Sequence, residues 1–397
     1  MTESRRWLTY EIIVFYCFLS SARACMTLGD NPYVDLVLSI IALAICPKRY
    51  FIHVPQRMFA AFLLAISAMY TMIGAPVTGY LAQFAMVFIP CQLIFLRREY
   101  QVELFEWLTR WYAVLLIASF VWWILWIMGV NLPHSAQKMA WEYNDDGFIL
   151  ENYYLFRHTI NLNVYAAIES VMRFNGFFLE PGHLGTITSL FLFIGKFDLS
   201  KWQNKIFILV IIFTFSAAAY MLTLTGYCMY RYAIDRWRVA FTFLMSALVI
   251  FLISQYNGGD NVINEIVFGK FTREQGAVEG RFSFGTQKLW NEVVADGSII
   301  WGKGANVNIT QSAGYKVFLI MNGILGAVIT LCAYWRIYII NSSKLGLLLL
   351  LLLIISFLQR TYCFWDAFLD PFILGTACLC HNKKYEEHGF ETLDSES

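Results

Sequence analysis

The chain has 397 residues, of which 58% are hydrophobic and 14% are charged, and its mean hydropathy is +0.55. Because a typical soluble domain has about 25% charged residues, this composition excludes an ordinary soluble protein. The 29 Lys and Arg balance the 28 Asp and Glu, so the formal net charge is +1. Apolar runs recur along nearly the whole length, and we therefore expect one integral membrane domain over residues 1–397.

The apolar runs have about the length of transmembrane helices, for which about 20 apolar residues are needed. The first run follows basic residues, as in a signal peptide, but it contains Glu11 and leads into further runs, so we interpret it as an uncleaved span. The twelve predicted segments are 7–25, 32–47, 58–75, 78–96, 107–130, 182–195, 206–220, 221–234, 239–256, 314–334, 345–361 and 364–380.

The segments 206–220 and 221–234 follow each other directly, without a loop between them. The stretch 206–234 is too long for one span and short for two. Thr223, Thr225 and Gly226 near its middle indicate a turn or a broken helix. Two short spans or a re-entrant hairpin would both return the chain to the side from which it started, and the sequence leaves both open.

The basic residues predict the orientation of the spans. Most Lys and Arg fall in one set of short loops, which the positive-inside rule assigns to the cytoplasm. Both termini are then cytoplasmic, in agreement with twelve crossings, and the polar tail 381–397 is expected to be disordered.

Two long connections, 131–181 and 257–313, fall on the opposite face. Function concentrates in long loops, so we expect the functional site there. In neither connection do Lys and Arg outnumber Asp and Glu, which argues against a nucleic-acid partner. A loose helical pattern over 161–172 predicts a short helix. The predicted fold is an all-α polytopic membrane protein with about 12 transmembrane segments and two long outer loops that contain short helices.

The segment Arg173–Gly185, RFNGFFLEPGHLG, places charge at the rim of a span. Charge at a membrane edge usually serves a substrate, an ion or a proton. Glu180 precedes Pro181, so it lies near a helix N-terminus, where the dipole favours a carboxylate. Glu180 is therefore a candidate general base or hydroxyl-binding group. The alternative is a structural carboxylate at the helix start or a partner of an Arg.

Two further polar residues of this segment are candidates. The planar guanidinium of Arg173 can bind a phosphate through two donors, although a salt bridge with Glu180 or Glu169 is an equal alternative. His183 lies one turn inside the rim and ranks second, because a buried neutral His is more often structural than catalytic.

The second long loop contains separate cations. Arg281 and Lys288 are seven residues apart, so in a helix they would share one face and could bind a pyrophosphate together. Lys303 lies between Gly302 and Gly304, where backbone N–H groups could approach an anion. No Walker motif is present. The His, Cys, Asp and Glu residues do not show metal-ligand spacing, so we expect no metal.

Several of these segments together resemble the O-antigen polymerases (Wzy) and the related O-antigen ligases. Arg173–Gly185 resembles an R-x-x-G-x-F-x-E-P segment that opens a span, and Leu222–Tyr227 (LTLTGY) resembles a T-x-S-x-(T/G)-G turn. Gly280–Gly304 resembles a G-R…W…G-x-G stretch, and Asn322–Gly326 (NGILG) follows it as a G-(I/L)-(I/L)-G start of a span. The ordered set covers about half of the chain.

The resemblance implies a metal-independent glycosyltransferase without cofactors in the bacterial inner membrane. It would join undecaprenyl-pyrophosphate-linked oligosaccharides on the periplasmic face, with a chain-length regulator as a candidate partner. Its catalytic residues would be Glu180 as the base, with Arg173 and Arg281 stabilising the leaving pyrophosphate. The residues assigned to substrate binding are Arg157, His183, Lys288 and Lys303. Three residues are alternatives to Glu180 as the base: His183, Asp145 and Asp146.

Two other functions are weighed against the polymerase. Ligases have a His in a short segment after the G-x-G, but the corresponding residues 306–319 (NVNITQSAGYKVFL) contain none, which favours the polymerase. A flippase or other transporter would show repeats and charge in the middle of its spans. The sequence shows no clear repeat, and charge within the spans is scarce beyond Glu11 and Asp35.

Overall fold

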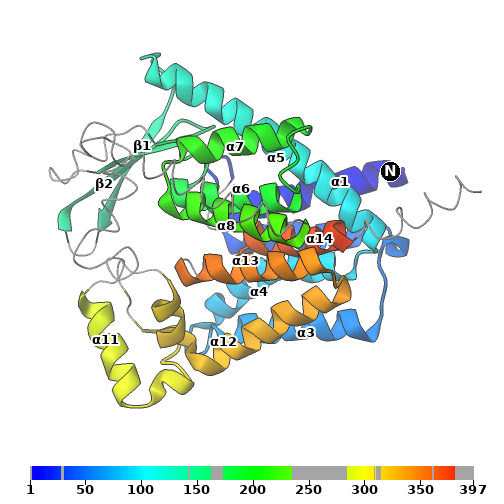
Figure 1. Cartoon of the computed structure of the whole chain (residues 1–397). Coiled ribbons are helices and arrows are strands. Elements are labelled where there is room, and N and C mark those ends of the chain that lie inside the picture. Colours follow the sequence, from blue (N-terminus) through cyan, green and yellow to red (C-terminus); the bar gives the residue numbers. More distant parts are fainter. Residues whose placement is uncertain are drawn as a thin grey trace, which may run out of the picture.

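The computed structural model describes residues 2–27, 31–141, 144–161, 173–234, 284–307, 309, 314–359 and 362–380. This part of the chain is mostly helical (Figure 1). Its helices are α1 (Glu3–Ser21), α2 (Pro32–Ile45), η1 (Lys48–Tyr50), α3 (Pro55–Tyr70), α4 (Val77–Phe95), α5 (Arg98–Ile127), α6 (Pro181–Ile194), α7 (Trp202–Phe213), α8 (Ala217–Ile234), α11 (Phe284–Ala295), η6 (Ser298–Ile300), α12 (Tyr315–Ile340), α13 (Lys344–Gln359) and α14 (Asp366–Cys380).

The helices have the composition of a membrane-embedded protein. By length and hydropathy, α4, α5 and α12 can each cross a membrane, and α2, α6, α7 and α13 are shorter apolar helices. Large apolar side chains such as Val37, Phe62 and Val121 are exposed on the outer helices, which a soluble protein would avoid over so large an area. Each predicted segment overlaps a described helix except 239–256, which lies outside the described residues.

The break between α7 and α8 differs from its predicted position. The chain leaves the helix at Thr214–Ser216, where Phe215 has a positive φ of 44°, whereas Thr223 and Gly226 lie within α8. A Cβ on Gly226 would lie 3.1 Å from the side chain of Leu352 and 3.3 Å from that of Phe193. Gly226 therefore permits close helix packing, as small residues do in membrane proteins.

The first long connection contains a sheet that the sequence did not predict. Strands β1 (Ser135–Trp141), β2 (Asn144–Asn152) and β3 (Arg157–Asn161) form an antiparallel sheet in the order β1-β2-β3. Each strand pairs with its neighbour in sequence, and these pairings satisfy the backbone without a helix. The helix predicted over 161–172 falls almost wholly outside the described residues, while the second connection does contain short helices, α11 and η6.

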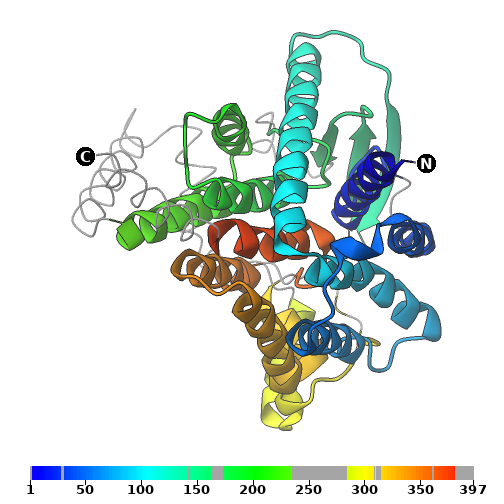
Figure 2. The ribbon, with the colours of Figure 1, turned by 90° about the vertical axis from the view of Figure 1, so that its right-hand side faces the viewer.

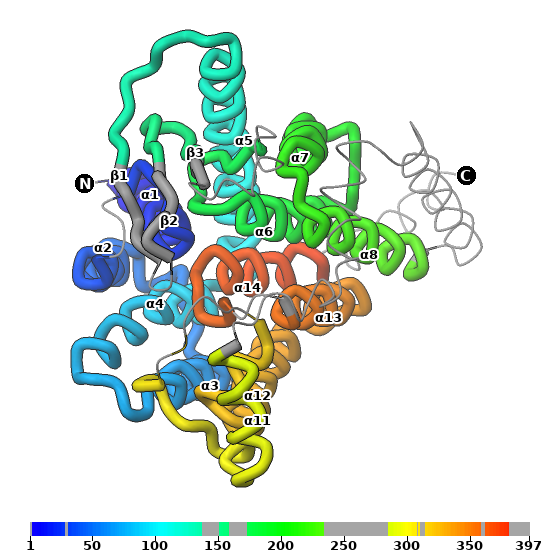
Figure 3. The backbone as a smooth tube through the Cα atoms, turned by 90° about the vertical axis from the view of Figure 1, so that its left-hand side faces the viewer, coloured from blue at the N-terminus to red at the C-terminus, as the bar shows by residue number. Residues whose placement is uncertain are grey.

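The last helix of the described residues, α14, lies in the middle of the helix bundle (Figures 2 and 3). It packs against α1, α4, α5, α6 and α13, and nearly all of its residues are buried. α6 is also almost fully buried and packs against α7, α8 and α14. α6, at whose start the candidate residues lie, is therefore held both by the helices that follow it directly and by a helix from the far end of the described chain.

Candidate functional site

The start of α6 holds Glu180 where the sequence places it. Glu180 is the N-cap residue, with an extended backbone (φ −137°), and Pro181 occupies the first turn. Its carbonyl accepts a hydrogen bond from the backbone N–H of His183 at 3.1 Å. Its partly exposed side chain does not cap the helix. The carboxylate therefore lies at the positive end of the α6 dipole without serving as its cap.

His183 lies beside two aromatic residues from the other end of the chain. Its ring is 2% exposed, and Nε2 lies 3.1 Å from the hydroxyl of Tyr362. The His183 ring also makes T-shaped contacts with the rings of Tyr362 and Trp365, with centroids 5.0 and 5.3 Å apart, and the Tyr362 and Trp365 rings stack on each other at 3.9 Å. Together they form an aromatic wall at the start of α6, a type of surface on which a sugar ring could pack.

Arg173 contacts backbone carbonyls at the break between α7 and α8. Its Nε donates to the carbonyl of Thr214 and its Nη2 to the carbonyl of Phe215, both at 3.2 Å. The last carbonyls of a helix lack partners within the helix, so Arg173 satisfies groups that the end of α7 leaves open. The guanidinium thus has a structural role, and it uses part of its donor capacity for it.

Arg157 joins three segments near the same place. The N–H of Arg157 donates to the carbonyl of Gly176 at 2.8 Å, and its Nη1 donates to the carbonyl of Arg23 at 2.6 Å. In the same junction, the N–H of Cys25 donates to the carbonyl of Phe177 at 2.9 Å. The sheet, the α1–α2 connection and the Arg173–Glu180 segment are therefore tied together, and Arg157 is brought to the candidate site.

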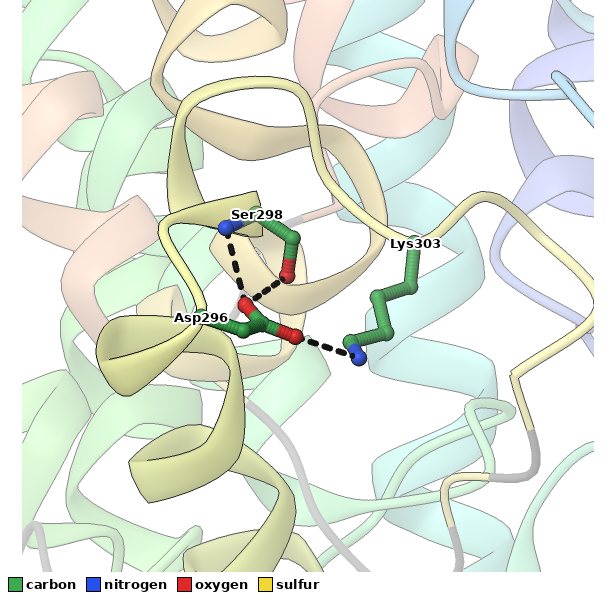
Figure 4. A network of polar contacts seen from close by, with 3 residues as sticks. All are labelled: Asp296, Ser298 and Lys303. Carbon is green, nitrogen blue, oxygen red and sulfur yellow. Dashed lines mark hydrogen bonds and ion pairs between the residues drawn. The ribbon is translucent and has the colours of Figure 1, made fainter.

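Lys303 forms an ion pair within the second loop (Figure 4). Its Nζ lies 2.9 Å from Oδ2 of Asp296, whose Oδ1 accepts from the N–H and hydroxyl of Ser298 at 2.8 and 2.5 Å. The hydrogen bonds from Ser298, and then the Lys303 contact, lower the pKa of Asp296 to about 2. Asp296 is therefore ionised at neutral pH, and an anionic ligand would compete with it for Lys303.

The glycines beside Lys303 serve packing, which corrects the anion-binding prediction for them. The N–H groups of Lys303 and Gly304 donate to the carbonyls of Ile320 and Met321, at 2.8 and 2.9 Å. A Cβ at Gly302 would lie 2.3 Å from the carbonyl oxygen of Met321. The loop therefore sits against α12 at its kink, where Gly323 has a φ of 66°, and these N–H groups already have acceptors.

The candidate residues form two groups. Contacts link Arg157, Arg173, Glu180 and His183 around the start of α6, whereas Lys288 and Lys303 belong to the α11–η6 region against α12. In Figures 1 and 3, α13 and α14 lie between α11 on one side and α6 and α7 on the other. Lys288 is exposed on α11. Arg281, together with its predicted pairing with Lys288, lies outside the described residues.

Sequence reasoning missed four residues near this site. Tyr362 and Trp365 were missed because no local signal connects them to His183, although an aromatic cluster between two apolar runs is visible in TYCFWD. Asp366 and Asp370 were missed although their spacing of four within an apolar run is a signal in itself.

A cavity of about 570 Å³ lies between α2 and α4 and contains none of the candidate residues. Its lining residues are Leu43, Cys46, Lys48, Phe51, His53, Phe88, Cys91, Gln92 and Phe95.

Comparisons of the chain with protein families, curated proteins and solved structures found no match.

Proposed function

We propose that the protein is a polymerase of lipid-linked oligosaccharides, of the O-antigen type. It would have twelve crossings of the bacterial inner membrane, both termini in the cytoplasm and its site on the periplasmic face. The proposal rests on the ordered motifs of the sequence and on the charge pattern of the short loops. The observation that supports it best is Glu180, a carboxylate at the N-terminus of α6, one turn before His183, whose ring contacts the aromatic pair Tyr362 and Trp365.

The chemistry assigns a role to each group. A hydroxyl of the incoming repeat unit attacks the anomeric carbon of the growing chain, whose bond to the lipid pyrophosphate breaks. Glu180 accepts the hydroxyl proton, and cations stabilise the charge on the departing pyrophosphate. Arg281 and Arg173 are the principal cations in this proposal and Arg157 assists them; Arg173 and Arg157 each use only part of their donor capacity on backbone carbonyls. Lys288 and Lys303 would bind the second substrate.

The test is deletion of the gene in its host, with the surface polysaccharide analysed on a gel and complemented by variants. The polymerase predicts a single repeat unit on the lipid A core after deletion, and long chains after complementation with the wild type. We expect Glu180→Gln to leave the protein in the membrane but to restore no long chains. Glu292→Gln, a matched change of an exposed Glu on α11, should restore them. Long chains with Glu180→Gln would refute the assigned base.

A transporter is the second candidate, and one observation favours it. Asp366 and Asp370 lie buried in the central helix, so charge within the spans is less scarce than the sequence analysis concluded, and such residues often mark transport pathways. After deletion, a flippase predicts that repeat units accumulate on the cytoplasmic side, whereas a ligase predicts long chains that remain on the carrier lipid. Analysis of the carrier-lipid intermediates of the same deletion strain, alongside its surface polysaccharide, therefore separates all three functions.

A further inference from the structure

The start of α14 meets α1 and α2 in a polar region inside the assembly. Ser20 of α1 donates to Oδ2 of Asp35 on α2 at 2.9 Å, and the neighbouring Ser21 accepts from the N–H of Ala367 on α14 at 2.9 Å. These two bonds bring the first turn of α14 beside Asp35. Asp366 and Asp370 lie one turn apart on α14 and therefore on the same face.

The carboxylates of this region lack donors. Asp370 is 0% exposed and Asp366 is 3% exposed. Within the described part of the chain, both oxygens of Asp370 and Oδ1 of Asp366 have no hydrogen-bond partner, and the same holds for Oδ1 of Asp35. Asp366 interacts electrostatically with both Asp370 and Asp35. Three acidic groups thus share a region with more acceptor oxygens than donors.

A second helix supplies an unpartnered polar side chain to the same region. The hydroxyl of Tyr10 on α1 is fully buried, has no partner among the described residues and interacts electrostatically with Asp370. On α4, Gln92 donates to the carbonyl of Ser39, while its own Oε1 is buried and has no partner among those residues. The missing component is therefore a source of positive charge or of donors, shared between α1, α2, α4 and α14.

The surrounding titratable groups do not provide that charge. Those that interact with the two aspartates are Asp35, Tyr10, Cys17 and Cys91. Two other titratable groups lie near α14. His183 of α6 contacts the ring of Trp365, just before α14, and Tyr334 of α12 contacts the ring of Phe372 on α14. The cations Arg98, Lys196 and Lys201, with Glu106, interact with Cys378 at the opposite end of α14.

We propose that Asp366 and Asp370 form a proton-binding site inside the membrane domain, with Asp35 as its connection to water. An ionised carboxylate buried without a partner is too costly to persist, and a bound proton removes the charge and supplies the missing donor. Asp35 is the least buried of the three acids, so protons from bulk water reach the pair through it. His, Cys, Asp and Glu in the described residues form no group that could hold a metal ion, which favours a proton over a metal. This site does not depend on the proposed polymerase activity.

Infrared spectroscopy of the full-length protein in phospholipid vesicles tests the site, because a protonated carboxylic acid and a carboxylate absorb at different frequencies. At neutral pH we expect a band of protonated carboxylic acid, which each of Asp366→Asn and Asp370→Asn diminishes. Asp296→Asn is the matched control, since Asp296 is ionised with a pKa of about 2, and it should leave the band unchanged. A band that neither α14 substitution alters, or the absence of a band in the wild type, would overturn the proposal.

Two further measurements keep the test decisive if a variant folds poorly. Asn has the shape and the donors of a protonated Asp, so each Asn variant should melt close to the wild type if the site holds a proton. On the wild type alone, the band should be the same in sodium and potassium buffers. A band that appears only when sodium is removed would mean that a sodium ion occupies the site, which also contradicts the proposal.

Discussion

Replacing Gly302 by Ala should destabilise the docking of the second loop on α12. Gly302 has a φ of 80°, and a Cβ there would lie 2.3 Å from the carbonyl oxygen of Met321 and 2.6 Å from the backbone nitrogen of Gly323. Both contacts are with backbone atoms, which cannot rotate away as a side chain can. The loop or the kink of α12 must therefore move to admit a methyl group.

A neighbouring glycine allows the magnitude to be separated into two parts. Gly297 has a similar φ of 75°, but a Cβ there would meet nothing within 4 Å. Gly297→Ala should cost only the left-handed strain of an Ala, about 1–2 kcal/mol. Gly302→Ala should cost that strain and a further 1–3 kcal/mol, roughly, for overpacking.

Thermal unfolding of the two purified variants in the same detergent, at one scan rate, measures the difference. We expect the order wild type, Gly297→Ala, Gly302→Ala, from highest to lowest midpoint. Equal midpoints for the two variants would refute the packing role of Gly302. In that case the anion-binding interpretation of the glycines would again apply, and Gly302→Ala should reduce polymer formation while it loses no more stability than Gly297→Ala.

Three other changes follow from single contacts. Arg173→Lys should lower the melting temperature, because the single ammonium of a Lys cannot donate to the carbonyls of both Thr214 and Phe215 as the planar guanidinium does. Each hydrogen bond from a charged donor contributes about 1.5–3 kcal/mol. An unchanged midpoint would contradict the structural role of Arg173. Tyr362→Phe should cost about 0.5–1.5 kcal/mol in the same assay because it removes the hydroxyl beside His183; an unchanged midpoint would show that this contact does not stabilise the fold. Because the pKa of Asp296 is lowered from 3.8 to about 2, the stability that its carboxylate contributes is complete above about pH 4 and is lost as the pH falls towards 2. The difference in midpoint between wild type and Asp296→Asn should therefore shrink as the pH falls through this window. A constant difference would contradict the stabilising role of the ionised Asp296.

The helices could be predicted from the sequence because apolar length alone specifies them. The position of the α7–α8 break could not, since Gly226 has the same identity whether it ends a helix or lets another helix approach. In this fold its neighbours, Leu352 and Phe193, decide between the two. The sheet in the first loop could not be predicted for a related reason. Strand pairing depends on partners elsewhere in the chain, whereas the helical pattern over 161–172 is a local feature of twelve residues.

The local geometry around Glu180 could also be predicted, because Pro181 and Gly182 specify the start of a helix. The contacts of the cations could not. Arg173 and Lys303 each have the residue type of a phosphate ligand, but carbonyls at a helix end and the carboxylate of Asp296 occupy them in the fold. A charge that is conspicuous in the sequence can therefore have a protein partner that only the tertiary structure reveals.

The segment 362–370 connects the two polar regions of the protein. Tyr362 and Trp365 form the aromatic wall beside His183, while Asp366 and Asp370 belong to the proposed proton site. Because Trp365 directly precedes Asp366, the first residue of α14, a shift of the start of α14 would move both regions together. Infrared spectra of Tyr362→Phe can test the link: a change in the carboxylic acid band would mean that the His183 contact influences the buried acids, and an unchanged band would mean that the two regions act separately.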